Sequence, residues 1–280
     1  MQTEELLLPE TALALKVPEC RQEEYEMVYH RPRTLLDVNM HYCPGCAHSL
    51  VHKLIMEVVE EMGIQEKTVG VAPVGCSVFA YDYMDIDMQE AAHGRAAAVA
   101  TAMKRLMPDK FVFTYQGDGD LAAIGIAETL HAINRGENIL IVFMNNAVYG
   151  MTSGQMAPTT LAGMKTTTSP DGRDVGYYGA PIKVAELMAN LPGAFYVTRQ
   201  AVNSANAVRR TKKALQHAFS YQSLHKGTCL VEIIGNCPSN WKMTPVEAAR
   251  FIDEEMVKTF PLGDIKVPKA EDLKNPEEVQ

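Results

Sequence analysis

The chain has little positive charge and no long apolar run. Its 280 residues include 26 lysines and arginines against 34 aspartates and glutamates, which gives a net charge of −8. No basic stripe is visible, and this argues against nucleic acid as a partner. No apolar run approaches the roughly 20 residues that span a bilayer, and the acidic N-terminus lacks the layout of a signal peptide. The sequence therefore predicts a cytoplasmic protein that does not bind membranes.

Cysteine is also scarce. Six cysteines in a chain of this length are too few for a disulfide scaffold. Thiols in such a setting more often serve metal or redox chemistry. The hydrophobic fraction of 47% is enough for one large core or two modest ones.

Composition divides the chain into three parts. Residues 1–40 carry prolines, acidic residues and scattered apolar residues, and are predicted to form an irregular arm. Residues 41–240 are predicted to form an α/β domain. Residues 241–280 are predicted to form one amphipathic helix, at about 245–259, and a tail rich in proline and charge. Either end is compatible with a solvated tail or with a segment that wraps around a partner subunit.

A strand–helix–strand unit lies in the middle of the chain. The sequence predicts a buried strand from Phe111 to Tyr115, a helix from Leu121 to Asn134 and a second apolar strand from Asn138 to Met144. Such a crossover returns both strand ends to the same edge of a parallel sheet, where ligands of open α/β folds bind. The expected fold is therefore α/β, with a mostly parallel sheet flanked by helices.

An aspartate and an asparagine follow these two strands. Asp118 lies in a Gly-Asp-Gly-Asp turn, and Asn146 ends an Asn-Asn pair 28 positions later. At one sheet edge their oxygens converge, and two protein oxygens leave Mg2+ to complete its octahedron with phosphate and water. The glycines let a diphosphate approach the backbone near a helix N-terminus. Each half alone is more often an ordinary turn, but together they predict a magnesium–diphosphate clamp.

Cys43 and Cys46 form a Cys-Pro-Gly-Cys motif at the start of a helix predicted at about 47–62. The macrodipole of a helix favours thiolates at its N-terminus, so metal ligation there is physically reasonable. A lone motif of this kind is compatible with a thioredoxin-type redox pair, a zinc half-site or half of an iron–sulfur site.

Two further cysteines, Cys76 and Cys237, follow apolar runs that are predicted to be strands. Strand ends at one edge of a parallel sheet lie near each other, so these thiols can converge with the Cys-Pro-Gly-Cys pair. Cys229 lies inside an apolar strand and is predicted to be a buried core residue. Cys20, in the irregular arm, is predicted to be an unliganded thiol.

Several turns near these motifs carry polar residues. A His-Gly-Arg turn at 93–95 precedes a helix predicted at 96–106, and it suits a phosphate or carboxylate or, alternatively, caps the helix. Ser77 is compatible with donation to a diphosphate or with a helix cap. The region Thr159–Thr168 is predicted to be a flexible loop that covers the site.

Taken together, these motifs resemble the β subunit of 2-oxoacid:ferredoxin oxidoreductases. The likeness spans about residues 40–244, and 146–155 matches the family closely, with Ala147 and Ser153 as departures. The resemblance implies a thiamine-diphosphate-binding fold. It also implies that Mg2+ is ligated by the Asp118 and Asn146 side chains and by the backbone carbonyl of Val148.

The family likeness further implies a [4Fe–4S] cluster held by four cysteines, namely Cys43, Cys46, Cys76 and Cys237. The implied cofactor contacts come from four turns, and they are Cys76, Ser77, His93, Gly94, Gly117, Asp118, Gly119, Asp120, Asn146, Val148, Tyr149, Gly150, Met151 and Thr152. His93 and Gln155 are the predicted catalytic residues.

The implied reaction is the oxidative decarboxylation of a 2-oxoacid to an acyl-CoA and CO2. Coenzyme A is the implied co-substrate, and electrons pass through the cluster to ferredoxin. The chain offers one diphosphate-binding unit, no second unit for the pyrimidine ring and no dense cysteine run for ferredoxin-type clusters. We therefore expect a hetero-oligomer with an α subunit that supplies the acid facing the pyrimidine, a ferredoxin-like cluster subunit and a γ subunit.

The stretch 237–241 and the arm before Cys43 look most like members that act on 2-oxoisovalerate or 2-oxoglutarate. We predict 2-oxoisovalerate ahead of 2-oxoglutarate and pyruvate, because the available cations, Arg173 and Lys165, lie in a loop where such side chains are usually solvated. The alternatives are a non-redox thiamine-diphosphate decarboxylase or transferase subunit, and a non-catalytic scaffold that carries a metal cluster.

Overall fold

The computed structural model describes residues 27–273 of the chain. From Pro32 onward these residues form one compact unit, and 27–31 belong to a separate N-terminal unit. Cys20 and most of the predicted arm lie outside the described residues. Among residues 27–273, none of the helices combines the length and the apolar character needed to cross a bilayer.

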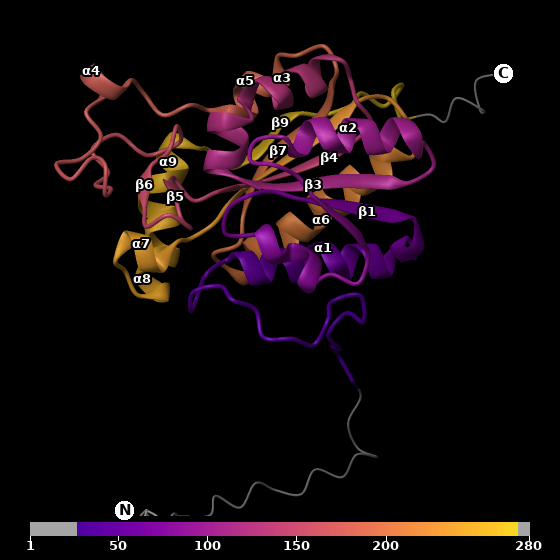
Figure 1. The fold of residues 1–280 in the computed structure, drawn as a ribbon, viewed down its shortest axis with the longest axis horizontal. Coiled ribbons are helices and arrows are strands. Elements are labelled where there is room, and N and C mark those ends of the chain that lie inside the picture. The colour runs from indigo at the N-terminus through magenta and orange to yellow at the C-terminus, as the bar shows by residue number, and fades with distance from the viewer. Residues whose placement is uncertain (1–26, 274–280) are drawn as a thin grey trace, which may run out of the picture. The chain divides into compact units, whose positions relative to one another are not determined.

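A seven-stranded sheet in the order β2-β1-β3-β4-β8-β7-β9 forms the centre of this unit (Figure 1). Its strands are β1 (Thr68–Ala72), β2 (Asp87–Glu90), β3 (Phe111–Gly117), β4 (Leu140–Asn145), β7 (Ala194–Ala201), β8 (Thr228–Ile234) and β9 (Gly263–Lys266). All neighbouring pairs are parallel except β7 with β9. The predicted α/β class with a mostly parallel sheet is confirmed.

Helices cover both faces of the sheet (Figure 1). One layer holds α1 (His48–Glu61) and α6 (Ala205–Gln222), and the other holds α2 (Ala96–Leu106), α3 (Ile126–Asn134) and α5 (Val184–Ala189). Alternate residues of β4 enter the two cores, so that Leu140 and Val142 pack in the core of the first layer, and Ile141 and Phe143 in that of the second. A strand buried on both sides needs a continuous apolar run, which is what the sequence of β4 provides.

The helix predicted from Leu121 to Asn134 has an irregular first part. The chain turns as a π-helix over Gly119–Ile124 and becomes α-helical only after Gly125. A Cβ at Gly125 would lie 2.4 Å from the Asp120 carbonyl oxygen and 2.7 Å from the Gly94 carbonyl oxygen. The backbones of Asp120, Gly94 and Gly125 therefore approach closely at this turn, which only glycine at position 125 allows.

The C-terminal part departs further from the prediction. The predicted single helix is a succession of α8 (Pro245–Phe251), a π-helical turn at Ile252–Met256 and α9 (Val257–Thr259). The sequence analysis missed β9, which lies in the predicted tail. The predicted boundary at residue 240 falls inside α7 (Pro238–Trp241). The division into a domain at 41–240 and a C-terminal part at 241–280 stays a prediction.

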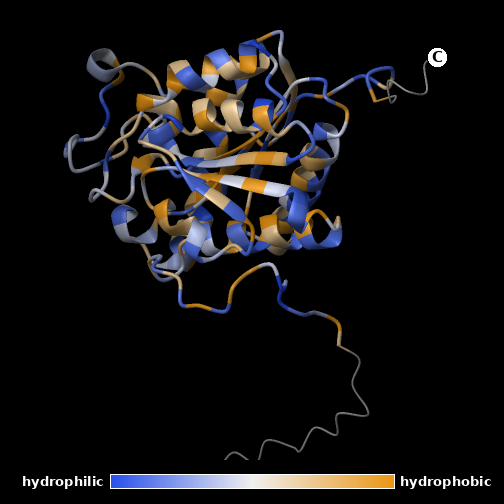
Figure 2. Cartoon of the chain, turned by 45° about the vertical axis from the view of Figure 1, so that its right-hand side comes forward, coloured by the Kyte–Doolittle hydropathy of each residue, from blue (hydrophilic) through white to orange (hydrophobic). Residues whose placement is uncertain are grey.

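The remaining elements are short. They are the 3-10 helices Gln65–Lys67 and Val78–Asp82, the hairpin of β5 (Val148–Tyr149) and β6 (Gln155–Met156), and the one-turn α4 (Val175–Tyr178). The loop that carries α4 projects from the body of the unit (Figure 1), and it is mostly hydrophilic or neutral in colour, whereas orange residues recur on the strands and on the helices around them (Figure 2).

Candidate active site

The candidate site lies at the carboxyl edge of the parallel sheet. β1, β3, β4 and β8 run in the same direction, so the residues that follow them meet at one edge. Those residues include Cys76, Asp118, Asn146 and Cys237, in that strand order. The open α/β architecture therefore gathers the predicted magnesium and cluster ligands on one side of the molecule.

Asp118 is a buried carboxylate, with 2% of its surface exposed. Its Oδ1 accepts the backbone N–H of Asn146 at 3.2 Å, and its Oδ2 accepts the Thr159 hydroxyl at 2.9 Å. Burial raises the pKa of Asp118 to about 8, although these hydrogen bonds oppose the rise. Between residues 27 and 273 no salt bridge reaches this carboxylate, so a bound cation would supply the missing countercharge.

The turn after β4 is fixed by hydrogen bonds on several sides. Ala147 has a φ of +60°, a left-handed conformation that is uncommon for a residue with a Cβ. The Asn146 side-chain oxygen accepts the N–H of Val148 at 3.3 Å, and the Asn146 carbonyl accepts the Trp241 indole N–H at 3.1 Å. The Thr160 hydroxyl donates to the Ala147 carbonyl at 2.5 Å. The turn thus presents the predicted ligands from a rigid frame.

The loop predicted at 159–168 begins as part of this frame. Thr159 and Thr160 are both fully buried, with 0% exposure, and both donate to the clamp residues described above. The prediction of a flexible covering loop does not describe these first two residues. Their position could not be read from the sequence, because a Thr-Thr pair in a loop carries no signal for burial.

Asp120 is buried as well, but its oxygens are already occupied. Oδ1 accepts the N–H groups of Val74 at 3.3 Å and Gly94 at 2.9 Å, and it lies 2.8 Å from His93 Nδ1. Oδ2 accepts the Gln116 amide at 2.7 Å. Asp120 therefore connects three turns and orients the His93 ring, which lines the cavity described next.

An open cavity lies between these turns. The predicted contacts that line it are Cys76, Ser77, His93, Gly117, Asp118, Gly119, Asp120, Asn146, Val148, Tyr149, Gly150, Met151 and Thr152. A Cβ at Gly119 would lie 2.2 Å from the Tyr149 ring, so only glycine allows that ring to pack on the turn. Ser77 is buried and makes no side-chain cap bond to the 3-10 helix at Val78–Asp82.

Two predicted residues do not line the cavity. Gly94 donates its N–H to Asp120, and it is Asp120 that lines the cavity. Gln155 is engaged with Thr152, because its amide donates to the Thr152 carbonyl at 2.5 Å and its oxygen accepts the Thr152 hydroxyl at 2.5 Å.

The sequence analysis missed His48, which lines the cavity from the first turn of α1. His48 is 3% exposed, and its Nδ1 lies 2.8 Å from the Tyr115 hydroxyl. Burial lowers the pKa of His48 to about 4, so the ring is neutral at pH 7. A signal was present, because His48 and His52 lie four residues apart on the apolar face of the helix.

The four predicted cluster cysteines lie beside this cavity. A Cβ at Gly150 would be 3.0 Å from Cys76 Sγ and 3.7 Å from Cys237 Sγ, so both sulfurs face the same glycine. Electrostatic interactions join Cys46 to Cys43 and Cys237, and Cys76 to all three. Asn240 donates to Cys237 Sγ at 3.2 Å.

Burial and the neighbouring sulfurs raise the pKa of Cys46 to about 11 and that of Cys76 to about 12. Thiolates therefore need a positively charged metal to form at this place. In the part of the chain from 27 to 273, no three His, Cys, Asp or Glu side chains are grouped so that they could hold a metal ion as they stand.

Two remaining predictions concern single residues. Cys229 lies in β8 with 0% exposure, as the sequence analysis expected of a core thiol. Arg173 is 5% exposed and is surrounded by backbone carbonyls, which accept its N–H groups and belong to Ala157, Pro158, Thr160, Tyr178, Gly179 and Ala180. Its guanidinium is therefore not available to a substrate carboxylate. Lys165 lines a different cavity, beside Trp241.

Comparison with known proteins gives a family match and several relatives. The C-terminal binding domain of thiamine pyrophosphate enzymes matches residues 73–233. The ketoisovalerate oxidoreductase subunit VorA of Methanothermobacter thermautotrophicus is 47% identical over 231 residues, which are 82% of this chain and 48% of that protein. This chain thus spans about half the length of that relative.

Two other relatives are covered over most of their length. The 2-oxoglutarate synthase subunit KorB of Methanocaldococcus jannaschii is 33% identical over 84% of this chain and 82% of its own. A solved structure of the 2-oxoglutarate:ferredoxin oxidoreductase of Magnetococcus marinus, with 2-oxoglutarate, coenzyme A and succinyl-CoA bound, superposes with a TM-score of 0.71 at 25% identity, over 88% of both chains.

Proposed function

The chain belongs to the thiamine-diphosphate-binding subunits of the 2-oxoacid:ferredoxin oxidoreductase family, and we propose that it is the catalytic β subunit of such an enzyme. The reaction is the oxidative decarboxylation of a 2-oxoacid to an acyl-CoA and CO2. The observation that carries the proposal is the meeting of a buried, uncompensated carboxylate with four thiols at one sheet edge.

Magnesium and the diphosphate of the cofactor occupy the turns after β3 and β4 in this proposal. The Asp118 and Asn146 side chains and the Val148 carbonyl hold Mg2+, and oxygen ligands of this kind are those that Mg2+ prefers. A Cβ at Gly117 would meet nothing within 4 Å, and this open space supports an approach of phosphate to the backbone. The remaining lining residues, Cys76, Ser77, His93, Asp120, Gly150, Met151 and Thr152, form the walls.

Thiamine diphosphate, when bound, supplies a carbon nucleophile and an electron sink for the 2-oxoacid. His93 is the acid–base candidate of this chain, because its ring lines the cavity and Asp120 holds its Nδ1. Gln155 reaches the cavity only through Thr152, so its proposed role is to position that residue.

A [4Fe–4S] cluster is the proposed acceptor of the electrons, ligated by Cys43, Cys46, Cys76 and Cys237. The electrostatic interactions among these thiols and the partial or full burial of Cys46, Cys76 and Cys237 support this assignment, whereas Cys43 is exposed. We expect partners that complete the reaction: an α subunit with the acid facing the pyrimidine, a ferredoxin-like cluster subunit, a γ subunit and ferredoxin as the acceptor. Thiols must stay reduced to ligate iron, which supports the cytoplasm as the location.

We propose 2-oxoisovalerate as the substrate, ahead of 2-oxoglutarate and pyruvate. The relative with 47% identity carries the ketoisovalerate name, whereas the 2-oxoglutarate relative is 33% identical. A second carboxylate, as in 2-oxoglutarate, needs a cation, and the sequence analysis named Arg173 and Lys165. Backbone carbonyls already accept the N–H groups of Arg173, so its guanidinium is not available to that carboxylate.

The test is anaerobic purification of the chain with its partners, followed by analysis of iron, sulfide and thiamine and by assays of viologen reduction with coenzyme A. We expect all three components and the fastest reduction with 2-oxoisovalerate. A colourless protein that contains thiamine but no iron would instead indicate a non-redox decarboxylase or transferase. A protein with metal but without thiamine would indicate a non-catalytic scaffold.

A further inference from the structure

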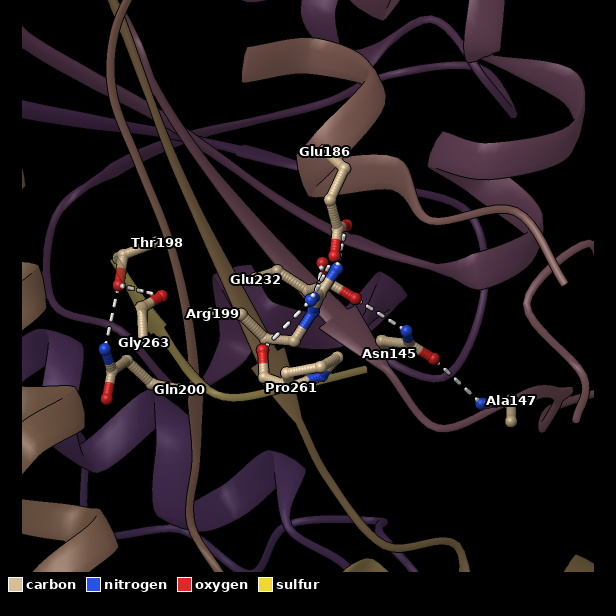
Figure 3. Close-up of polar contacts among 9 residues, drawn as sticks. All are labelled: Asn145, Ala147, Glu186, Thr198, Arg199, Gln200, Glu232, Pro261 and Gly263. Atoms are coloured by element: carbon tan, nitrogen blue, oxygen red, sulfur yellow. Dashed lines mark hydrogen bonds and ion pairs between the residues drawn. The ribbon is translucent and has the colours of Figure 1, made fainter. Parts of the chain in front are cut away.

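A line of buried polar side chains runs across the sheet and ends at the turn after β4 (Figure 3). Asn145, with 0% exposure, is the last residue of β4. Its side-chain oxygen accepts the N–H of Ala147 at 3.2 Å, and its amide donates to Glu232 Oε1 at 2.7 Å. One side chain therefore connects the left-handed residue of the turn to the neighbouring strand.

The line continues through Glu232 to Arg199. Both side chains are fully buried, and Arg199 Nε donates to Glu232 Oε2 at 2.9 Å. The other end of the guanidinium donates to both oxygens of Glu186 on α5 and, at 3.1 Å, to the carbonyl of Pro261. Each side-chain nitrogen and oxygen atom of Asn145, Glu232 and Arg199 has at least one hydrogen-bond partner along this line (Figure 3).

The order of the strands explains how residues so far apart in the sequence meet. β4, β8 and β7 are neighbours, and Glu232 pairs in register with Arg199 on one side and Phe143 on the other. Asn145 lies two positions beyond Phe143, on the same face of β4, and so its amide reaches back to Glu232.

A buried ion pair of this kind contributes little to stability compared with apolar side chains of the same volume. A network in which every member is satisfied does, however, hold its members in one arrangement. In this protein the arrangement that it holds is a left-handed turn, and that turn carries both Asn146 and Val148.

We propose that Asn145, Glu232 and Arg199 are positioning residues for the magnesium–diphosphate site. They act through the turn, because they fix the direction of the Asn146 side chain and of the Val148 carbonyl without touching the cofactor. This inference rests on the proposed function, in which those two residues ligate Mg2+.

The test measures the binding of Mg2+ at saturating thiamine diphosphate by calorimetry, on the full-length chain with the subunits that co-purify. Asn145→Ala removes both hydrogen bonds, and we expect the dissociation constant to rise about 10- to 100-fold, as is usual when a group behind a metal ligand is lost. The matched control is Thr198→Val. Thr198 is buried beside Arg199, and its hydroxyl bonds to Gly263 and Gln200, away from the turn.

We expect the control to lower the Tm as much as Asn145→Ala does but to leave the dissociation constant within about twofold. Equal loss of affinity in both variants would mean that the network only stabilises the fold, and would overturn the positioning role. If the unaltered protein binds no thiamine diphosphate, the proposed function itself fails, which is a separate outcome.

A second pair of variants tests the hydrogen bonds without a cavity. Asn145→Asp places a carboxylate against Glu232, and we expect it to weaken Mg2+ binding by a similar factor. Adding Glu232→Gln restores a donor–acceptor pair with its direction reversed, and it leaves an oxygen that accepts from Ala147. We expect the double variant to recover most of the affinity. A double variant as weak as Asn145→Asp alone would contradict the inference.

Discussion

At the scale of single residues, Asp118 and Asp120 show how two neighbouring carboxylates acquire different roles. Both are 2% exposed. Asp120 takes three N–H donors from the protein and also contacts His93, whereas Asp118 takes one backbone N–H and one hydroxyl. Asp118, which accepts fewer hydrogen bonds than Asp120, is therefore the carboxylate better suited to bind a cation. The sequence alone could not separate them, since both follow a glycine in the same turn.

The raised pKa of Asp118 predicts that magnesium binding depends on pH. Below a pKa of about 8 this carboxyl carries a proton, which Mg2+ must displace on binding. We therefore expect the apparent affinity to rise about tenfold per pH unit up to about pH 8 and to level off above it, with one proton released per ion at the lower pH. Calorimetry in buffers of different ionisation enthalpy measures both quantities.

The control for this prediction is Asp118→Asn, which keeps the shape and removes the titrating group. We expect it to bind Mg2+ at least 100-fold more weakly and without the pH dependence. Affinity that stays constant between pH 6 and pH 9 in the unaltered protein would show that the pKa of Asp118 is not raised, and undiminished Mg2+ binding by Asp118→Asn would show that Asp118 is not the ligand.

The cysteines allow a matched comparison at this scale. We expect Cys76→Ser to lose most of the iron and sulfide, because serine replaces a predicted ligand whose sulfur lies at the cavity wall. Cys229→Ser should keep the iron but lose about 1–3 kcal/mol of unfolding free energy, since it buries a hydroxyl in an apolar core. Iron analysis and denaturant unfolding distinguish the two effects.

Equal iron content in both variants would contradict the cluster assignment. It would also favour a cluster on a partner subunit as the source of any brown colour in the complex.

At the scale of elements, the sequence was informative wherever an apolar run or a turn motif marks a strand or a helix. β3, β4 and α2 lie close to their expected bounds, and the turns after the strands carry the predicted residues. β9 could not be predicted, because Gly263–Lys266 has no apolar run and pairs with β7 only through the tertiary fold. The contacts of Thr159, Trp241 and Arg173 could not be predicted either, because sequence patterns do not indicate which residues far apart in the chain will meet in the fold.

The loop that carries α4 depends on Arg173 in the same way. A lysine can satisfy at most three of the carbonyls that surround this guanidinium. We expect Arg173→Lys to reduce the unfolding free energy by about 2 kcal/mol and to make residues 161–182 more sensitive to proteolysis, because buried carbonyls lose their donors.

Kinetics with two substrates provide the control for this variant. The ratio of kcat/KM for 2-oxoisovalerate and 2-oxoglutarate should stay within about threefold of the unaltered ratio. A selective loss with 2-oxoglutarate would show that Arg173 binds the substrate and does not only hold the loop.

At the scale of the whole molecule, the sheet is closed at one side by a short strand of opposite direction. β9 covers the edge of β7, and Thr198 and Arg199 reach across to Gly263 and Pro261. An exposed β7 would present unpaired backbone groups, which pair readily with other chains.

We therefore expect removal of residues 262–280 to lower the Tm by about 5 °C or more and to cause concentration-dependent aggregation. The control is removal of 274–280 alone, which leaves β9 in place. Thermal unfolding and light scattering measure both effects. A monomeric protein with unchanged Tm after the longer truncation would show that β9 does not protect the edge.

The turn from Asn146 to Gly150 contacts both the proposed diphosphate site and the cysteines of the proposed cluster site. Asn146 bonds to Asp118, and Gly150 lies against Cys76 Sγ. If the proposed diphosphate and cluster sites are coupled through this turn, thermodynamics requires the coupling to be reciprocal. Occupancy of the diphosphate site should shift the reduction potential of the cluster site, and the redox state should in turn change how tightly the diphosphate is bound.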